Sequence, residues 1–304
     1  MPPLPTHVLR GLRALLNGFS QIFLQSHPGC GLLVLLALAL GAPNLLGGAL
    51  LGGLSGMLVA RWRDCPRADI EIGLYGYNGI LLGLLASLQF AWSPLLALLI
   101  ALGGGLSSLL LAPWMTRMRR RGWLPAFTLP FVLLAWALLA LAAPLPLSLR
   151  DEVAAGAPTL DGFGTLLAVL RGLGQVIFLD NPLSGLCLLL GLLLADRRAA
   201  LWALLGAAAG LGLAALLGWS QADALNGLFG YNAVLAAIAL SQVQRRPWVL
   251  LLGSVLATLL QHGLASLGLP PLTLPFILTC WLIRLSAQGW RRAVKAGAPG
   301  RNVH

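Results

Sequence analysis

The residues of this chain that could do chemistry inside its apolar stretches are neutral, polar and paired. Each carries an amide or a hydroxyl group, which can form hydrogen bonds without bearing charge. Ionisable residues, on which proton-coupled or ion-coupled transport usually depends, are missing from the centres of these stretches. This set of groups suits a small neutral polar solute that moves down its gradient. The residues concerned are Gln21, Gln175, Tyr77, Tyr231, Thr128 and Thr273.

A membrane-embedded enzyme is the alternative from another class, and the sequence gives it little support. The nine carboxylates lie mostly in loops or at the ends of apolar stretches. The four histidines lack metal-ligand spacing, the four cysteines lack C-x-x-C spacing, and no nucleophile elbow, H-E-x-x-H or phosphate-binding loop occurs. We therefore expect no catalytic residue, no metal and no cofactor. A third hypothesis, a subunit that assembles without transporting, predicts no continuous polar path.

The composition is that of an integral membrane protein. Of the 304 residues, 58% are hydrophobic and 10% are charged, whereas soluble domains carry about a quarter charged residues. Apolar runs of about 20 residues can each cross a hydrocarbon core of roughly 30 Å, and we count about ten of them. The net charge of +11 arises from arginines in short loops and tails, a pattern typical of cytoplasmic loops. The charge therefore predicts a lipid bilayer as partner and no nucleic acid.

Three motifs recur in the same order in the two halves of the chain. The matched pairs are 18–28 with 172–182, 73–78 with 227–232, and 124–131 with 269–276. The first two pairs are 154 residues apart and the third is 145 residues apart, which indicates a duplication. We predict a first repeat over residues 1–146, an extracytoplasmic linker over 147–164, and a second repeat with a cytoplasmic tail over 165–304.

The distribution of basic residues indicates that the second repeat is inverted. Basic clusters follow the apolar runs that end near Ala60 and Met115, and the equivalent loops of the second repeat contain no Lys or Arg. Conversely, the pairs at 197–198 and 245–246 match uncharged positions of the first repeat. Equivalent loops therefore lie on opposite sides of the membrane, as five crossings per repeat require. Both termini are then cytoplasmic, and Arg171 is the one residue that fits this scheme poorly.

The first apolar stretch of each repeat is interrupted by polar residues and a proline. Pro28 and Pro182 each remove a helix hydrogen bond, and the polar residues before them are tolerated only against protein or a water-filled cavity. We expect a re-entrant half-helix followed by a full span in each repeat. Inverted repeats place a substrate path near the bilayer midplane between such helices. The predicted fold class is an all-α polytopic membrane protein with two inverted five-span repeats and two re-entrant half-helices.

Each polar pair also has a structural interpretation. The two glutamines could bond neighbouring helices, and the threonines beside prolines could satisfy freed carbonyl groups. The tyrosines could be packing or interface anchors. Asn78 and Asn232 we expect to brace bent or closely packed helices.

The duplicated motifs resemble those of the urea transporter family. The residues that carry the resemblance are the Gln-to-Pro stretches, the two Gly-Tyr-Asn motifs, the two Leu-Thr-x-Pro-Phe-like stretches, and Asp-Asn-Pro-Leu-Ser-Gly-Leu at 180–186. The similarity covers essentially the whole chain. It implies passive transport of urea across a bacterial inner membrane, a homotrimer with one pore per protomer, and no cofactor. A channel for another small amide or for ammonia is the alternative in the same class.

The resemblance also implies which residues line the pore. In the family, a narrow filter presents oxygen acceptors on one side and flat apolar slots opposite, which would replace the hydration of planar urea. Gln21 and Gln175 match the two ends of the filter, and Thr128 and Thr273 match its central constriction. The slot-forming residues matched are Ile22, Leu24, Val176 and Phe178, and those of the facing wall are Tyr77, Leu81, Tyr231 and Leu235. Leu24 stands where an aromatic residue is frequent, and His27 where asparagine is usual.

Overall fold

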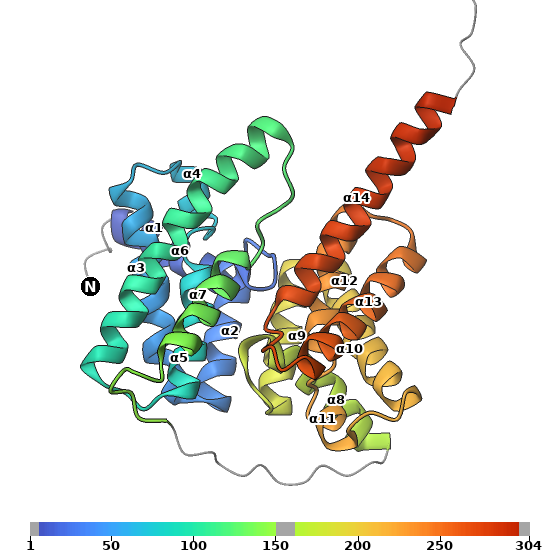
Figure 1. Ribbon diagram of the computed structural model, residues 1–304. Coiled ribbons are helices and arrows are strands. Elements are labelled where there is room, and N and C mark those ends of the chain that lie inside the picture. The colour runs from blue at the N-terminus through green and yellow to red at the C-terminus, as the bar shows by residue number, and fades with distance from the viewer. Residues whose placement is uncertain (1–5, 150–161, 298–304) are drawn as a thin grey trace, which may run out of the picture.

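A computed structural model describes residues 6–149 and 162–297, and within these ranges the chain is built from helices (Figure 1). The extended pairing among the described residues is limited to an isolated antiparallel bridge between Phe90 and Leu149. The all-helical membrane class predicted from the sequence is confirmed. Most of the predicted linker, 147–164, and the end of the C-terminal tail lie outside the described residues.

The two halves of the chain contain the same series of α-helices. The first half comprises α1 (Thr6–Gln21), α2 (Pro28–Gly41), α3 (Leu46–Trp62), α4 (Arg67–Glu71), α5 (Tyr77–Gln89), α6 (Pro94–Arg121) and α7 (Leu129–Leu141). The second comprises α8 (Gly162–Gly174), α9 (Pro182–Ala195), α10 (Arg197–Leu216), α11 (Gln221–Leu225), α12 (Tyr231–Val243), α13 (Pro247–Ser266) and α14 (Leu274–Gly297). Two short 3₁₀ helices, η1 (Pro43–Leu45) and η2 (Gln175–Ile177), precede α3 and follow α8.

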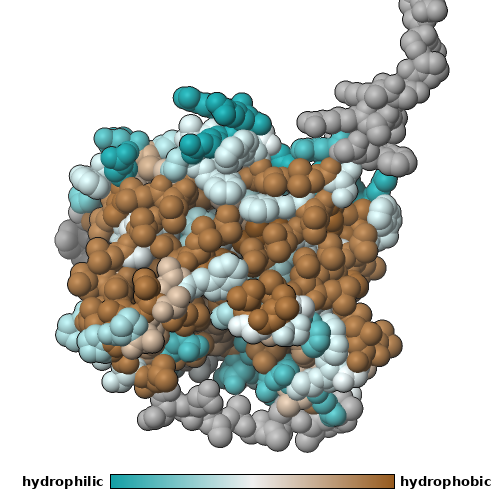
Figure 2. All heavy atoms as spheres, in the orientation of Figure 1, coloured by the Kyte–Doolittle hydropathy of each residue, from teal (hydrophilic) through white to brown (hydrophobic). Residues whose placement is uncertain are grey.

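The second half is inverted relative to the first. In Figure 1, α4 lies at one end of the molecule, whereas its equivalent α11 lies at the opposite end. The halves pack against each other through α2 and α9, where the Ser184 hydroxyl donates to the Ala37 carbonyl at 2.9 Å. Figure 2 shows a broad apolar band across the face in view, with hydrophilic residues gathered toward the two ends. This distribution is that of a protein surrounded by lipid.

Several crossings are divided into short helices. By length and apolarity, α6, α10, α13 and the η1–α3 segment can each cross a membrane unaided, and α8–η2 and α9 form a pair bent by 77°. The apolar helices α7 and α12 have 13 residues each, and at 1.5 Å per residue such a helix covers only about 20 Å of a core of roughly 30 Å. These helices place their first residues at depth inside the molecule.

The predicted interruptions near Pro28 and Pro182 are present. The preceding helical segments end at Gln21 and Ile177, and each proline begins the following helix. Proline is well tolerated in a first turn because its missing N–H would have no partner there. His27 and Asn181 cap these helices: their side chains accept the backbone N–H groups of Cys30 and Leu183. Histidine at 27 therefore performs the capping role that asparagine performs at 181.

Glycine allows the innermost helices to approach closely. A Cβ atom added at Gly52 of α3 would lie 2.0 Å from the Gly79 carbonyl oxygen of α5, and one added at Gly83 would lie 1.9 Å from that of Gly48. Such stripes of small residues are the usual means of packing helices within lipid. As a result, α5 is buried from Tyr77 to Ser87, and its equivalent α12 is buried along nearly its whole length. These two helices carry the polar motifs that reach the centre of the molecule.

Candidate permeation site

The two halves meet at a pair of threonines. Thr128 immediately precedes α7, Thr273 immediately precedes α14, and their hydroxyl oxygens lie 2.7 Å apart, within hydrogen-bond distance. Both residues are almost fully buried, with 2% and 4% of their surface exposed. In such a pair one hydroxyl donates to the other, so one proton and several lone pairs are left for a third group. The pair can therefore both donate to and accept from a polar solute.

Helix N-termini surround this pair. The first turns of α7 and α14 begin beside the threonines, and the N-terminus of a helix carries a partial positive charge from its unpaired N–H groups. Two such ends at a buried point disfavour a cation there, whereas a neutral molecule with a carbonyl group is not penalised. The site is thus electrostatically suited to a neutral solute.

Two asparagines hold these helix ends in place. The Asn78 side-chain oxygen accepts the Phe131 N–H at 3.1 Å, and the Asn232 side-chain oxygen accepts the Phe276 N–H at 3.2 Å. Each contact satisfies an N–H group in the first turn of α7 or α14. Asn232 also donates to the Leu272 carbonyl and to the Gln261 side-chain oxygen, both at 2.9 Å. The bracing role predicted for these asparagines is confirmed.

Four residues without glycine's freedom adopt left-handed backbone conformations at equivalent positions. Their φ angles are 58° at Leu24, 62° at Phe178, 46° at Phe127 and 47° at Leu272. Such a conformation costs a branched or aromatic residue roughly 1–3 kcal/mol and persists only where its surroundings enforce it. Leu24 and Phe178 lie in the two breaks that follow the half-helices, and the other two directly precede the paired threonines. The same left-handed backbone conformations are therefore enforced at equivalent positions of both repeats.

The tyrosines and carbonyl groups next to the threonines are arranged differently in the two repeats. The Tyr77 hydroxyl donates to the Phe127 carbonyl, whereas the equivalent Leu272 carbonyl accepts from Asn232. Tyr77 is buried and Tyr231 is partly exposed. The predicted facing-wall residues Leu81 and Leu235 are both 1% exposed, on α5 and α12.

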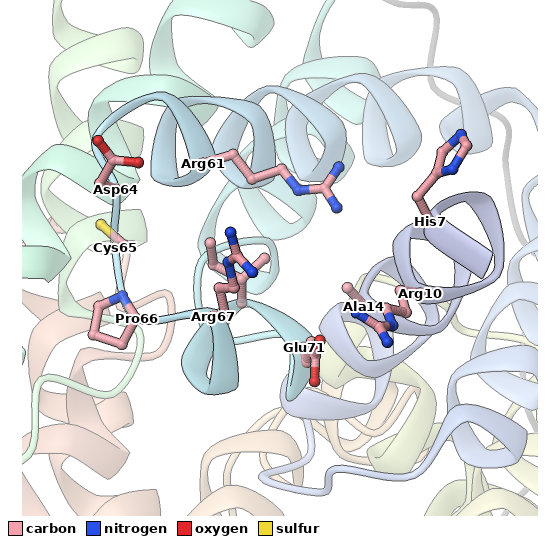
Figure 3. A pocket seen from close by; sticks show the side chains of 10 residues that line it. His7, Arg10, Ala14, Arg61, Asp64, Cys65, Pro66, Arg67 and Glu71 are labelled. Carbon is pink, nitrogen blue, oxygen red and sulfur yellow. The ribbon is translucent and has the colours of Figure 1, made fainter. Parts of the chain in front are cut away.

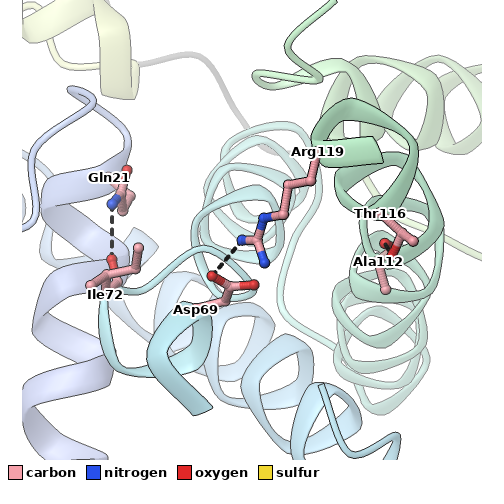
Figure 4. A network of polar contacts seen from close by, with 6 residues as sticks. All are labelled: Gln21, Asp69, Ile72, Ala112, Thr116 and Arg119. Atoms are coloured by element: carbon pink, nitrogen blue, oxygen red, sulfur yellow. Dashed lines mark hydrogen bonds and ion pairs between the residues drawn. The ribbon is translucent and has the colours of Figure 1, made fainter. Parts of the chain in front are cut away.

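The glutamines Gln21 and Gln175 have the same orientation in the two repeats. Gln21 donates from its side-chain nitrogen to the Ile72 carbonyl at 2.9 Å (Figure 4) and to the Ser26 hydroxyl, while Gln175 donates to the Asn226 carbonyl at 3.0 Å. These contacts fix each nitrogen toward the protein. The side-chain oxygens form no hydrogen bond among the described residues. Each glutamine can therefore present an oxygen acceptor to a solute.

The predicted slot residues are buried or half-buried, and two of them contact the other repeat. Ile22 and Val176 are 1% and 2% exposed, and Leu24 and Phe178 are half-buried. The Phe178 ring lies 6.5 Å from that of Phe131 in the other repeat. The Leu24 carbonyl accepts from the Gln242 side-chain nitrogen at 2.9 Å, again across the repeats.

A cavity of about 620 Å³ is lined by Phe127, the residue before Thr128. Its lining also includes Gln242 and Gln244 at the end of α12, and Cys280 and Arg284 of α14. The cavity therefore reaches the chain next to the threonine pair from the side of α12 and α14. The structure thus brings the two threonines into contact and places Tyr77 against Phe127, the residue before Thr128. It places Gln21 and Gln175 at the breaks of the two half-helices.

Several contributors to the site carry no sequence signal. Gln261, Gln242 and Leu272 lie outside the matched polar pairs or have no polar side chain, and a left-handed leucine looks like any other leucine in a sequence. Arg171, which fitted the charge pattern poorly, donates to the carbonyl groups of Asp180 and Leu225. In the first repeat Asn17 makes the equivalent bond to the Glu71 carbonyl at 2.7 Å. Arg171 therefore has a structural role that overrides the orientation rule.

Comparison with known proteins identifies the family. The urea transporter family model matches residues 12–288. Urea transporter 1 of Ovis aries is 30% identical over 302 residues, which cover 89% of this chain and 75% of that protein. Urea transporter 1 of Rattus norvegicus is 29% identical over 312 residues, covering 91% of this chain and 77% of that protein. With its inverted halves and paired polar motifs, this chain belongs to the urea transporter family.

Proposed function

We propose that this chain forms a channel that carries urea passively down its concentration gradient. The observation that carries the proposal is the buried hydroxyl pair of Thr128 and Thr273, 2.7 Å apart where the two inverted repeats meet. Urea transporters from sheep and rat match nearly the whole chain, and this likeness supports urea as the permeant. It also supports transport rather than catalysis. Among the described residues, no three His, Cys, Asp or Glu side chains gather as a metal site would require.

The chemistry of urea fits the groups at the site. Urea is planar and carries four N–H donors and one carbonyl acceptor, and removing its water is costly unless those groups find partners. In this mechanism Gln21 and Gln175 offer side-chain oxygens to its N–H groups at the two breaks. The threonine pair offers lone pairs to the N–H groups and a proton to the carbonyl. The apolar slot and wall residues exclude wider solutes, and the helix ends exclude cations.

The proposal includes the setting of the channel. We place it as a homotrimer in a bacterial inner membrane, with repeats over 1–146 and 165–304, an extracytoplasmic linker between them and both termini in the cytoplasm. The orientation is supported by Arg61, Arg67 and the basic end of α6, which follow spans of the first repeat. The equivalent loops of the second repeat contain no Lys or Arg, as loops on the opposite side of the membrane would. Labelling of single introduced cysteines with a membrane-impermeant reagent, in intact and in lysed spheroplasts, tests the orientation. Native mass spectrometry in detergent tests the trimer.

Passive transport and selectivity are tested with purified protein in liposomes. Shrinkage and re-swelling are followed by stopped-flow light scattering under inward gradients of urea, acetamide or methylammonium, with and without a protonophore. Fast re-swelling with urea that is unchanged by the protonophore supports the proposal. Flux that requires a proton gradient contradicts passive transport, and fast flux of acetamide or methylammonium with slow urea flux contradicts the choice of permeant.

A further inference from the structure

A charged cavity lies away from the candidate permeation site, between α1, the end of α3 and α4 (Figure 3). Its volume is about 620 Å³. Three arginines line it, each from a different element: Arg10 from α1, Arg61 from α3 and Arg67 from α4. In Figure 3 the Arg61 side chain extends across the cavity, Arg67 projects toward it from α4, and Arg10 lies on the opposite wall.

Among the described residues, the three guanidinium groups form no ion pair with a carboxylate. Asp64 and Glu71 also line the cavity, but within the described part of the chain the ion pair present joins Arg119 to Asp69, outside this cavity, at 2.6 Å. Three guanidinium groups around one cavity repel one another, the two carboxylates of the lining offset this only in part, and an anion placed among the arginines relieves the rest. The arginines outnumber the carboxylates, and Arg13, one turn along α1, adds a further positive charge beside Glu71.

The helices that carry Arg10 and Arg61 also expose large apolar side chains. On α1, Val8, Leu9 and Leu12 lie within two residues of Arg10 in the sequence and are 42%, 48% and 50% exposed. On α3, Leu58 and Trp62 flank Arg61 and are 57% and 77% exposed. Large apolar side chains next to cationic ones are typical of a segment at the boundary between lipid tails and headgroups. The cavity therefore opens where a phospholipid can place both its phosphate and its chains.

We propose that this cavity binds the phosphate group of an anionic phospholipid. A guanidinium group offers two parallel N–H donors that match a pair of phosphate oxygens, so arginine suits a phosphodiester better than a free halide or carboxylate. The acyl chains lie against the exposed apolar residues of α1 and α3. Basic pockets between helices near the membrane surface are known to recognise lipid headgroups by this chemistry. The proposal does not depend on which solute the channel carries.

A bound phosphate also joins elements that position the pore. Arg10 belongs to α1, whose Asn17 and Gln21 donate to the carbonyl groups of Glu71 and Ile72 at the end of α4, the helix that begins with Arg67. One anion held by Arg10, Arg61 and Arg67 thus ties α1 to α3 and α4. We therefore expect lipid binding to raise the thermal stability of the protein.

Lipid binding is measured by native mass spectrometry and by thermal unfolding of the detergent-solubilised full chain. The probes are phosphatidylglycerol, phosphatidylcholine with the same chains, and inorganic phosphate. The test variant is Arg10→Gln with Arg61→Gln and Arg67→Gln. The matched control, Arg120→Gln with Arg121→Gln and Arg245→Gln, removes the same charge from exposed arginines outside the cavity. The single variant Arg61→Gln serves if the triple variant does not fold.

Phosphatidylglycerol is expected to bind and stabilise the wild-type protein more than phosphatidylcholine does. The cavity variant should bind it about a hundredfold more weakly, since each of its three lost basic residues contributes about 1 kcal/mol near a lipid surface, and the control variant should bind it nearly as the wild type does. Equal loss in both variants would mean a diffuse charge effect and would overturn the proposal. Inorganic phosphate that stabilises as strongly as the lipid would assign the cavity to a free anion instead.

Discussion

The hydroxyl oxygens of Thr128 and Thr273 lie 2.7 Å apart, although the two residues are separated by 145 positions in the chain. They are equivalent residues of two inverted repeats, so their contact marks the place where the repeats meet. In the proposed channel, residues related in this way would face a permeating solute with the same group from both sides. The asparagines that hold α7 and α14, and the left-handed residues that precede the threonines, all serve to fix this one contact.

Removing Asn232 should destabilise the protein more than removing Asn78. Asn232 makes three hydrogen bonds to Phe276, Leu272 and Gln261, whereas Asn78 accepts a single bond from Phe131 and its buried nitrogen has no partner among the described residues. At about 1 kcal/mol for each hydrogen bond, Asn232→Ala should cost about 1–3 kcal/mol more free energy of unfolding than Asn78→Ala. Unfolding in mixed micelles measures the difference, and equal costs would contradict the assigned network.

Gly210 and Gly212 provide a matched test of helix packing within α10. A Cβ atom added at Gly210 would lie 2.3 Å from the Phe229 carbonyl oxygen, whereas one added at Gly212 would meet no atom within 4 Å. Gly210→Ala should therefore displace the segment before α12 and lower the yield of folded protein, and overpacking of this kind typically costs about 1–3 kcal/mol. Gly212→Ala should be neutral or slightly stabilising. Size-exclusion profiles of the two variants would refute this packing if they were the same.

The ion pair between Arg119 and Asp69 should affect the free energy of unfolding chiefly because Asp69 is a buried carboxylate that needs a partner. Asp69 is 6% exposed and one of its oxygens has no partner in the described part of the chain, whereas the Arg119 side chain is 49% exposed. Arg119→Ala leaves a buried charge unpaired and should lower the free energy of unfolding by about 1–2 kcal/mol, after allowance for solvent screening. Adding Asp69→Asn to that variant should recover part of the loss. A double variant less stable than Arg119→Ala alone would contradict this view of the pair.

Substitutions at Gln175 distinguish the role of its side-chain oxygen from that of its side-chain nitrogen. Gln175→Glu keeps an acceptor oxygen and loses the donor to the Asn226 carbonyl, and Gln175→Met loses both. If the oxygen serves the permeant, the methionine variant should lose more urea flux, by about five- to tenfold, which corresponds to one hydrogen bond of about 1 kcal/mol. If the residue is only a brace, the glutamate variant should be the worse of the two, because its carboxylate faces a carbonyl group.

The fold could largely be predicted from the sequence because lipid imposes strong constraints. Long apolar runs, basic loops and three duplicated motifs predict an inverted-repeat helical membrane protein, and the helices and their inversion confirm it. The lengths of individual helices could not be predicted in the same way. The polar residues before Pro28 predict a break near residues 22–27 but not the residues at which the flanking helices end, and the positions of α7 and α14 depend on tertiary bonds to Asn78 and Asn232.

The candidate site could be predicted in part. The paired threonines and asparagines stand out because the duplication shows them twice, and the structure brings both pairs to the centre. Gln242 and Gln261 have no polar counterpart in a matched motif, so only their contacts reveal them. The different partners of the Phe127 and Leu272 carbonyl groups arise from packing that is not the same in the two repeats. The pore roles of the other matched residues stay predictions.

The most direct test is urea flux through proteoliposomes that contain wild-type protein, Thr128→Ser with Thr273→Ser, or Thr128→Val with Thr273→Val. Serine keeps the hydroxyl pair, and valine keeps the shape while removing it. Wild-type and serine proteins should show rapid, saturable re-swelling, and the folded valine variant should be at least about tenfold slower, as the loss of about 1.4 kcal/mol implies. Wild-type flux no faster than that of protein-free liposomes would contradict the urea channel, and valine flux equal to wild type would contradict the central role of the threonine pair.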